Sequence, residues 1–198
     1  EIRRHIHKFS PKSGEPYVGV IHRLDKPVSG VMVYAKTKKA AAALSAQVSA
    51  GKMSKTYLTV VCGKPVDNNG TYVDYLKQDK KNNCSRIVDK SDPESKRAEL
   101  EYKVLDCIRT EEKDSQYLSL VEIKLLTGRH HQIRVQFSGH GTPLYGDGKY
   151  GNNEKAVRKS LALCACHLKF KHPATGKIMD FQIKPDTGAF KLFSKSND

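Results

Sequence analysis

Residues 98–125 read AELEYKVLDCIRTEEKDSQYLSLVEIKL, and this stretch decides the fold class. Apolar and polar residues alternate over Ala98–Ile108 and again over Tyr117–Leu125. This alternation is typical of strands with one buried face and one face in water. The polar residues 109–116 (RTEEKDSQ) separate the two runs. The sequence therefore predicts a β-hairpin here.

Further strands are expected on both sides of this hairpin, because short β-branched and aromatic runs lie between turn residues. They cover residues 18–21, 31–36, 55–63, 72–76, 161–170 and 177–183. The polar residues 77–95 are interpreted as an exposed loop or a short hairpin. Strands that outnumber helices and follow one another directly indicate an α+β fold, with a mainly antiparallel or mixed sheet flanked by helices and loops.

Two helices are expected. The Ala-rich residues 38–50 favour a helix, with Thr37 as its N-terminal cap and Gly51 as its stop. A second, short helix is expected over His131–His140, opened by Gly128.

The composition favours one domain that binds a polyanion. The 198 residues suit a single domain over 1–198, and 35 Lys and Arg against 21 Asp and Glu give a net charge of +14. Such an excess of cations favours a polyanion as a partner. No apolar run is long enough to cross a bilayer and no signal peptide is visible, so no membrane partner is expected. Five scattered cysteines favour reduced thiols and a cytoplasmic location.

The segment 19–37 reads GVIHRLDKPVSGVMVYAKT. Its two apolar runs are separated by the charged residues of HRLDKPV (22–28), which we call the charged insert. Asp25 is expected at a turn near the core, where a carboxylate needs a cation to stay ionised. The alternative is a salt bridge of Asp25 with Arg23 or Lys26 that only fixes the turn.

A second basic motif covers residues 126–151, with two arginines, three histidines and a Gly-rich end. On a helix, Arg129 and Arg134 would point about 140° apart, so one can pair with an internal carboxylate while the other faces a phosphate. The loop GDGKYG (146–151) offers backbone N–H groups to a ligand. Each histidine alone is more often an ordinary hydrogen-bonded residue, but their density here indicates a site.

These segments together resemble the RluA-type pseudouridine synthases. HRLDKPVSGVMVYAKT (22–37) resembles the family's signature, KTYLTVVCG (55–63) its second motif, and LLTGRHHQIRVQFSGHGTPLYGDGKYG (125–151) its third. LCACHLKFKHPATGKIMDFQIKPD (163–186) is similar to the family's C-terminal stretch. The resemblance implies a pseudouridine synthase fold and an enzyme that isomerises uridine in RNA without metal or cofactor. Ribosomal RNA is the first choice of substrate and transfer RNA the second.

The resemblance also implies residue roles. Asp25 matches the catalytic aspartate, Tyr57 the aromatic that stacks on the target base and helps to remove its C5 proton, and Arg134 the arginine that pairs with the carboxylate. Arg23 matches the residue that enters the RNA stack. Arg23, Arg129 and His131 are thus expected to bind substrate.

The chain departs from the family pattern in three places. The usual Thr before Ser-Gly is Val28, and the usual Thr or Ser after Gly-Arg is His130. The family's N-terminal strand segment is also not recognised, so we expect a catalytic domain that lacks it.

Two alternatives remain open. One is a non-catalytic RNA-binding module on the same fold, which fits the charge equally well but gives no reason for Asp25 beside Tyr57. The other is a zinc site, for which the candidate ligands are Cys164, Cys166, His167 and His172. Their spacing is not a familiar zinc pattern, so core thiols are favoured.

Overall fold

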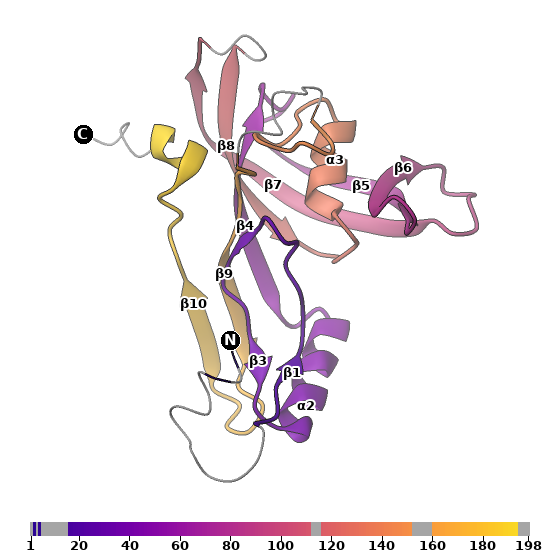
Figure 1. The fold of residues 1–198 in the computed structure, drawn as a ribbon, viewed down its shortest axis with the longest axis vertical. Helices are drawn as coiled ribbons and strands as arrows, with labels where there is room; N and C mark the ends of the chain where they lie inside the picture. The colour runs from indigo at the N-terminus through magenta and orange to yellow at the C-terminus, as the bar shows by residue number, and fades with distance from the viewer. Residues whose placement is uncertain (1, 3, 5–15, 112–115, 152–159, 194–198) are drawn as a thin grey trace.

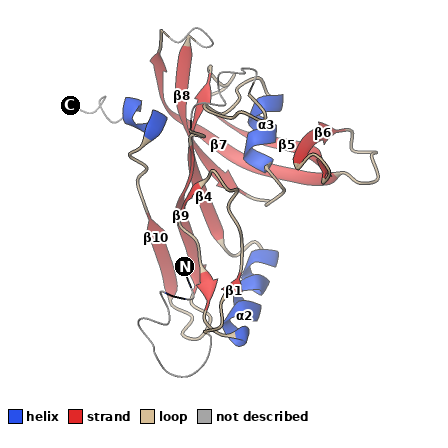
Figure 2. Cartoon of the chain, viewed as in Figure 1, coloured by secondary structure: helices blue, strands red, loops and turns tan. Residues whose placement is uncertain are grey.

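The computed structural model describes residues 2, 4, 16–111, 116–151 and 160–193. Its main element is an eight-stranded sheet (Figures 1 and 2). Seven strands follow the order β10-β9-β4-β8-β7-β5-β6, in which every pair of neighbours is antiparallel. These strands are β4 (Ser54–Cys62), β5 (Asn69–Asp79), β6 (Cys84–Val88), β7 (Lys96–Arg109), β8 (Tyr117–Leu125), β9 (Leu163–Lys171) and β10 (Ile178–Gln182). The predicted α+β fold with a mainly antiparallel sheet is confirmed.

The hairpin predicted from the alternating pattern is β7–β8. Its inward residues, such as Leu100, Val121 and Ile123, are fully buried. The neighbouring strand β5 is longer than the apolar residues 72–76 indicated, because its polar ends also form ladder hydrogen bonds with β6 and β7. Residues 77–95 contain β6, so the hairpin interpretation of this segment is the correct one.

Helix α2 (Lys38–Ser49) begins where the sequence predicts. The Thr37 hydroxyl oxygen accepts a hydrogen bond from the Ala40 backbone N–H at 3.1 Å, and Gly51 follows the helix in a left-handed conformation. Leu44 packs into a cluster with Met53, Leu168 and Phe170. Helix α2 therefore covers the lower part of the sheet in Figure 1.

Helix α3 (Gln132–Gly139) begins one residue later than predicted, and Gly128 does not open it. The residue before its first turn is His131, which has a left-handed backbone with φ of 52°. Such a conformation is unusual for a residue other than glycine and marks a position held by its contacts.

Residues 31–36 are predicted to form one buried strand, but only Tyr34–Ala35 of this segment is a strand. β2 (Ser29–Gly30) pairs in parallel with β9, and β3 (Tyr34–Ala35) pairs with β1 (Gly19–Val20) in a separate two-stranded sheet. The chain thus crosses from one sheet to the other directly after the charged insert.

The core lies on both faces of the main sheet. Val61 belongs to a cluster with Phe137 of α3, whereas its neighbour Val60 belongs to a cluster with Phe190 of the 3₁₀ helix η2 (Gly188–Phe193). Cys164 and Cys166 are buried in the second cluster, in the manner of core thiols. In the described ranges no helix is long and apolar enough to span a membrane, and no three His, Cys, Asp or Glu residues are grouped to hold a metal.

Gly30→Ala is expected to lower the free energy of unfolding by about 2–4 kcal/mol. Gly30 has φ of 139°, and a Cβ there would lie 2.4 Å from the Ala165 carbonyl oxygen. The matched control is Gly51→Ala. Gly51 has a left-handed φ of 65° but open space around it, so this substitution should lower the free energy of unfolding by only about 1–2 kcal/mol. Urea unfolding measures both values, and equal losses would contradict this role of the close contact at Gly30.

Candidate active site

The charged insert forms a tight turn that presents Asp25 toward α3. The Val28 N–H donates to the Asp25 carbonyl oxygen at 2.8 Å, which closes the turn over Pro27. The Asp25 carboxylate oxygen Oδ2 lies 3.5 Å from Arg134 Nη1 and 3.6 Å from His131 Nε2. Residues more than one hundred positions apart thus meet at one carboxylate. In the described part of the chain, Asp25 forms no ion pair with Arg23 or Lys26.

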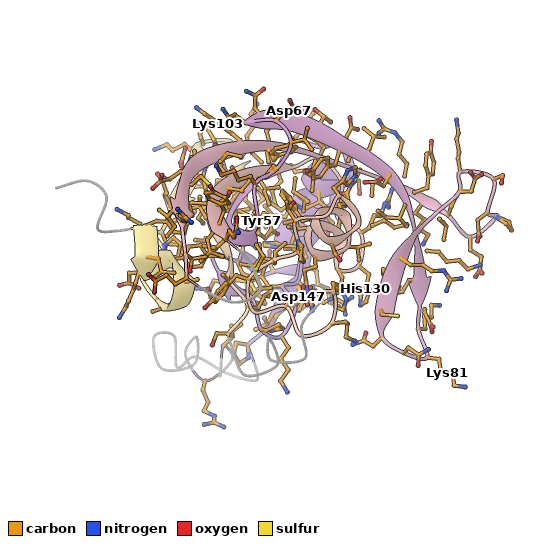
Figure 3. The ribbon with its side chains drawn as sticks, turned by 90° about the horizontal axis from the view of Figure 1, so that it is seen from above. Tyr57, Asp67, Lys81, Lys103, His130 and Asp147 are labelled. Atoms are coloured by element: carbon orange, nitrogen blue, oxygen red, sulfur yellow. The ribbon has the colours of Figure 1, made fainter. Side chains whose placement is uncertain are left out.

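The Asp25 side chain is 30 % exposed, so it faces an opening rather than a dry interior. In Figure 3, which looks down on the molecule, Tyr57, His130 and Asp147 lie inside the curve of the sheet. Lys103 and Asp67 lie at its rim. The carboxylate is therefore accessible to a ligand while its cationic partner is buried.

Arg134 is oriented mainly by a second carboxylate, Asp147. Arg134 Nε and Nη2 donate to the two Asp147 oxygens at 2.8 Å each, which leaves Nη1 to face Asp25. Asp147 is 1 % exposed and also accepts the backbone N–H groups of Lys149 and Tyr150. Burial alone would raise the pKa of Asp147, but the Arg134 guanidinium and these N–H groups outweigh burial and lower it.

The loop 146–151 thus uses its N–H groups differently from the prediction. In the described structure they hold Asp147, which in turn fixes Arg134. No role for Asp147 is predicted from the sequence. The signal that could have found it is the turn GDGK, in which an Asp side chain commonly accepts a hydrogen bond from the N–H two residues later.

His131 lies behind the Asp25 carboxylate with its ring buried. Its Nδ1 is 2.7 Å from the Tyr150 hydroxyl, which accepts the Ser85 backbone N–H at 2.8 Å. The Asp25 carboxylate can only accept a hydrogen bond, so we place the His131 proton on Nε2, toward Asp25, and the Tyr150 hydroxyl then donates to Nδ1. Burial lowers the pKa of His131 to about 4, since it outweighs the attraction of Asp25, so the ring is neutral at pH 7.

Tyr57 stands on β4 beside a bulge in the pairing with β9. Its ring is buried in the cluster onto which Leu24 and Val28 of the charged insert pack. Burial, together with the charge of Asp25, raises the pKa of Tyr57 to about 12. No hydrogen bond to its hydroxyl is found among the described residues, so the hydroxyl is available to a ligand.

The two other predicted substrate-binding residues lie on the surface of the protein. Arg23 is exposed on the same turn as Asp25. Arg129 is exposed, and its Nε donates to the Arg97 carbonyl oxygen at 2.9 Å. His140 has an ordinary structural role, since it stacks on Tyr72 and pairs with Asp74.

Comparison with known proteins agrees with this geometry. The sequence profile of a family described as RNA pseudouridylate synthase matches residues 3–139. The chain is 36 % identical over 185 residues to the ribosomal large subunit pseudouridine synthase D of Zymomonas mobilis, which covers 89 % of this chain and 56 % of that protein. It is 34 % identical over 180 residues to the ribosomal large subunit pseudouridine synthase C of Salmonella typhimurium, covering 86 % and 53 %.

The solved structure of human RNA pseudouridylate synthase domain containing 4 has the same fold, with a TM-score of 0.78 and 23 % identity over 96 % of this chain and 80 % of that one. The chain spans a little more than half the length of the curated relatives named above. The four ordered motifs, the mainly antiparallel sheet and the matching profile lead to one conclusion: this chain belongs to the RluA-type family of RNA pseudouridine synthases.

Proposed function

We propose that residues 1–198 form the catalytic domain of an RNA pseudouridine synthase that isomerises uridines in structured RNA. The observation that carries the proposal is the meeting of Asp25 with Arg134, 3.5 Å apart, beside the buried ring of Tyr57. Ribosomal RNA is the first candidate substrate, in keeping with the names of the relatives, and transfer RNA the second. The cytoplasm is the proposed place of action.

The isomerisation breaks the bond between ribose C1′ and uracil N1 and forms a bond between C1′ and C5. The C5 hydrogen leaves as a proton and N1 gains one, so no electrons are exchanged with another reactant. One carboxylate can serve this reaction, either by adding covalently to the sugar or base or by removing a ribose proton. Asp25 is assigned this role because its oxygen is accessible and a fixed guanidinium lies beside it.

The surrounding residues position this carboxylate. Arg134 is held rigidly by Asp147 and offers its remaining nitrogen to Asp25. His131 contributes a neutral ring with Nε2–H toward the same oxygen, so we assign it to positioning Asp25 more than to binding RNA. The target uridine must leave its stack to reach them, which costs a few kcal/mol. Arg23, exposed on the same turn, is the proposed residue that fills the gap.

Tyr57→Phe is expected to lower kcat roughly 100-fold while RNA affinity stays within about two-fold, because the ring remains and only the hydroxyl is lost. With a pKa of about 12 the phenol is neutral at pH 7, so it can remove the C5 proton only as a relay that passes its own proton on. Tyr57→Leu should weaken RNA binding by about 1–3 kcal/mol through lost stacking. Single-turnover kinetics and filter binding measure these effects. Full activity of Tyr57→Phe would remove the hydroxyl from the mechanism.

The proposed function is tested by tritium release from RNA that carries 5-³H-uridine. An active synthase releases tritium to water as pseudouridine forms, whereas an RNA-binding module binds the RNA and releases none. Mapping pseudouridines in RNA from cells with and without this gene then identifies the substrate. If no site in any cellular RNA depends on the gene and purified protein releases no tritium, the proposal is wrong.

A further inference from the structure

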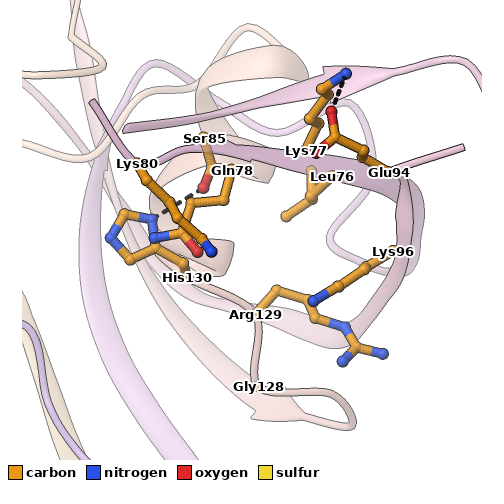
Figure 4. A pocket seen from close by; sticks show the side chains of 10 residues that line it. All are labelled: Leu76, Lys77, Gln78, Lys80, Ser85, Glu94, Lys96, Gly128, Arg129 and His130. Carbon is orange, nitrogen blue, oxygen red and sulfur yellow. Dashed lines mark hydrogen bonds and ion pairs between the residues drawn. The ribbon is translucent and has the colours of Figure 1, made fainter. Parts of the chain in front are cut away.

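A pocket of about 380 Å³ lies beside the active site, between the β5–β6 hairpin and the loop that precedes α3 (Figure 4). Its lining combines the ends of β5 and β6, the start of β7 and residues 128–130. Its polar lining residues include Gln78, Lys80, Lys96, Arg129 and His130. Among the described residues none of these forms an ion pair with Asp25, and the proposed mechanism assigns this pocket no role.

The hairpin is fixed to the active site by hydrogen bonds. His130 Nδ1 lies 2.9 Å from the Ser85 hydroxyl and its Nε2 lies 3.2 Å from the Asn83 side-chain oxygen. Lys149 Nζ donates to the Asn83 carbonyl oxygen at 2.8 Å. The His130 ring stacks on His131 with centroids 3.7 Å apart, and His131 faces Asp25. The pocket is therefore separated from the carboxylate by one stacked pair of histidine rings.

The pocket carries an excess of positive charge. Lys77 is compensated, since its Nζ lies 2.7 Å from Glu94 and 3.2 Å from Asp92. Lys80, Lys96 and Arg129 form no ion pair within the described part of the chain. Figure 4 shows Lys96 and Arg129 together on one side of the pocket and Lys80 with His130 on the other. Cations gathered around a hollow in this way attract an anion and bind it more strongly than scattered surface charges do.

The lining also offers groups that suit a nucleobase. Gln78 is exposed, and its side-chain amide carries both a donor and an acceptor, as the edge of a base does. Leu76 closes the floor of the pocket but is only 3 % exposed, so it offers little surface to a ligand. A volume of about 380 Å³ is at the small end of ligand pockets, which suits a single nucleotide.

We infer that this pocket binds one nucleotide of the substrate RNA that flanks the target uridine. Its phosphate lies among Lys80, Lys96 and Arg129, and Gln78 reads the edge of its base. The inference rests on the proposed function for the identity of the ligand. It adds that the β5–β6 hairpin, through this pocket, determines which RNA sequences or loops deliver a uridine to Asp25.

The first experiment compares two double variants of the full chain in binding to a structured fragment of ribosomal RNA. Lys80→Ala with Lys96→Ala removes two pocket charges. Lys103→Ala with Lys184→Ala removes two exposed charges elsewhere, Lys103 being on the same strand as Lys96. We expect the pocket variant to bind at least 10-fold more weakly and to lower the slope of log affinity against log salt by about 1–2, with the control within two-fold. Equal losses in both variants, or none in the pocket variant, would overturn the inference.

The second experiment tests base reading. Wild type and Gln78→Ala are compared on RNAs that carry each of the four bases at each position next to the target. Wild type should prefer one base at one position by at least five-fold in kcat/KM, and Gln78→Ala should reduce that preference below two-fold. An unchanged preference contradicts base reading by this pocket. RNA binding is measured without catalysis. A protein that binds RNA as expected but forms no pseudouridine therefore refutes the proposed function without contradicting the inference that this pocket binds a nucleotide.

Discussion

Asp25→Asn is expected to abolish pseudouridine formation, with a loss of at least about 1,000-fold in the rate of tritium release from 5-³H-uridine RNA. Asn has nearly the same shape as Asp but carries no negative charge, so it can neither add to the substrate nor remove a proton. The turn should survive, because its closing bond joins the backbone of residues 25 and 28. The fold is held by the two core faces of the sheet, which this substitution does not touch.

RNA affinity is the internal control for this variant. The basic residues that would contact phosphates are unchanged, so the dissociation constant should stay within about three-fold of the wild-type value. Asp67→Asn serves as the matched substitution, since Asp67 is exposed at the rim of the sheet and should leave the rate unchanged (Figure 3). If the Asp25→Asn variant still formed pseudouridine at a similar rate, the Asp25 carboxylate would not be the reacting group.

Asp147→Asn is expected to lower the free energy of unfolding by about 3–5 kcal/mol, because it leaves the buried Arg134 guanidinium without its anionic partner. Both hydrogen bonds of the pair are 2.8 Å long and the Asp147 side chain is fully buried, so water cannot replace the lost carboxylate. Urea unfolding followed by circular dichroism measures the change. Arg134 should also lose its orientation toward Asp25, and the rate of pseudouridine formation should fall in the fraction that remains folded.

An exposed pair provides the comparison. Asp180 lies 2.6 Å from His167 and 3.3 Å from Lys169, but it is about half exposed, so Asp180→Asn should lower the free energy of unfolding far less than Asp147→Asn does. If the two substitutions had equal effects, burial of the Arg134–Asp147 pair would not be what makes it strong.

The pH dependence of the buried pair follows from the sign of the shift. The pKa of Asp147 is lowered in the folded state, so its contribution to stability is complete above the unfolded value of about 4 and is lost as the pH falls through the folded value. The difference in stability between wild type and Asp147→Asn should therefore be constant from pH 5 to pH 7 and shrink below pH 4. A difference that grows in acid would contradict this assignment.

Local sequence patterns are sufficient to predict the β7–β8 hairpin, the position of α2 and the residues around which a site forms. Period-two alternation predicts which face of β7 and β8 is buried. Thr37 caps its helix through a hydrogen bond from Ala40, which lies only three residues further along the chain. These features depend on neighbours along the chain, so local patterns are sufficient to predict them. The charges between apolar runs likewise mark Asp25 as a residue that needs a cation, whereas the choice of Arg134 over Arg129 comes from the resemblance of HQIR to the family motif.

The contacts that orient these candidate residues become visible only in the folded structure. It showed that Asp147 orients Arg134, that His131 adopts a left-handed backbone behind Asp25, and that Gly30 pairs in parallel with Ala165. It also showed that the β5–β6 hairpin is fixed to the same loop. Each of these features is set by contacts between segments that folding brings together, or by a balance of burial against charge. Such contacts leave no periodic signal in the sequence, because the energy that selects them exists only once both partners are in place.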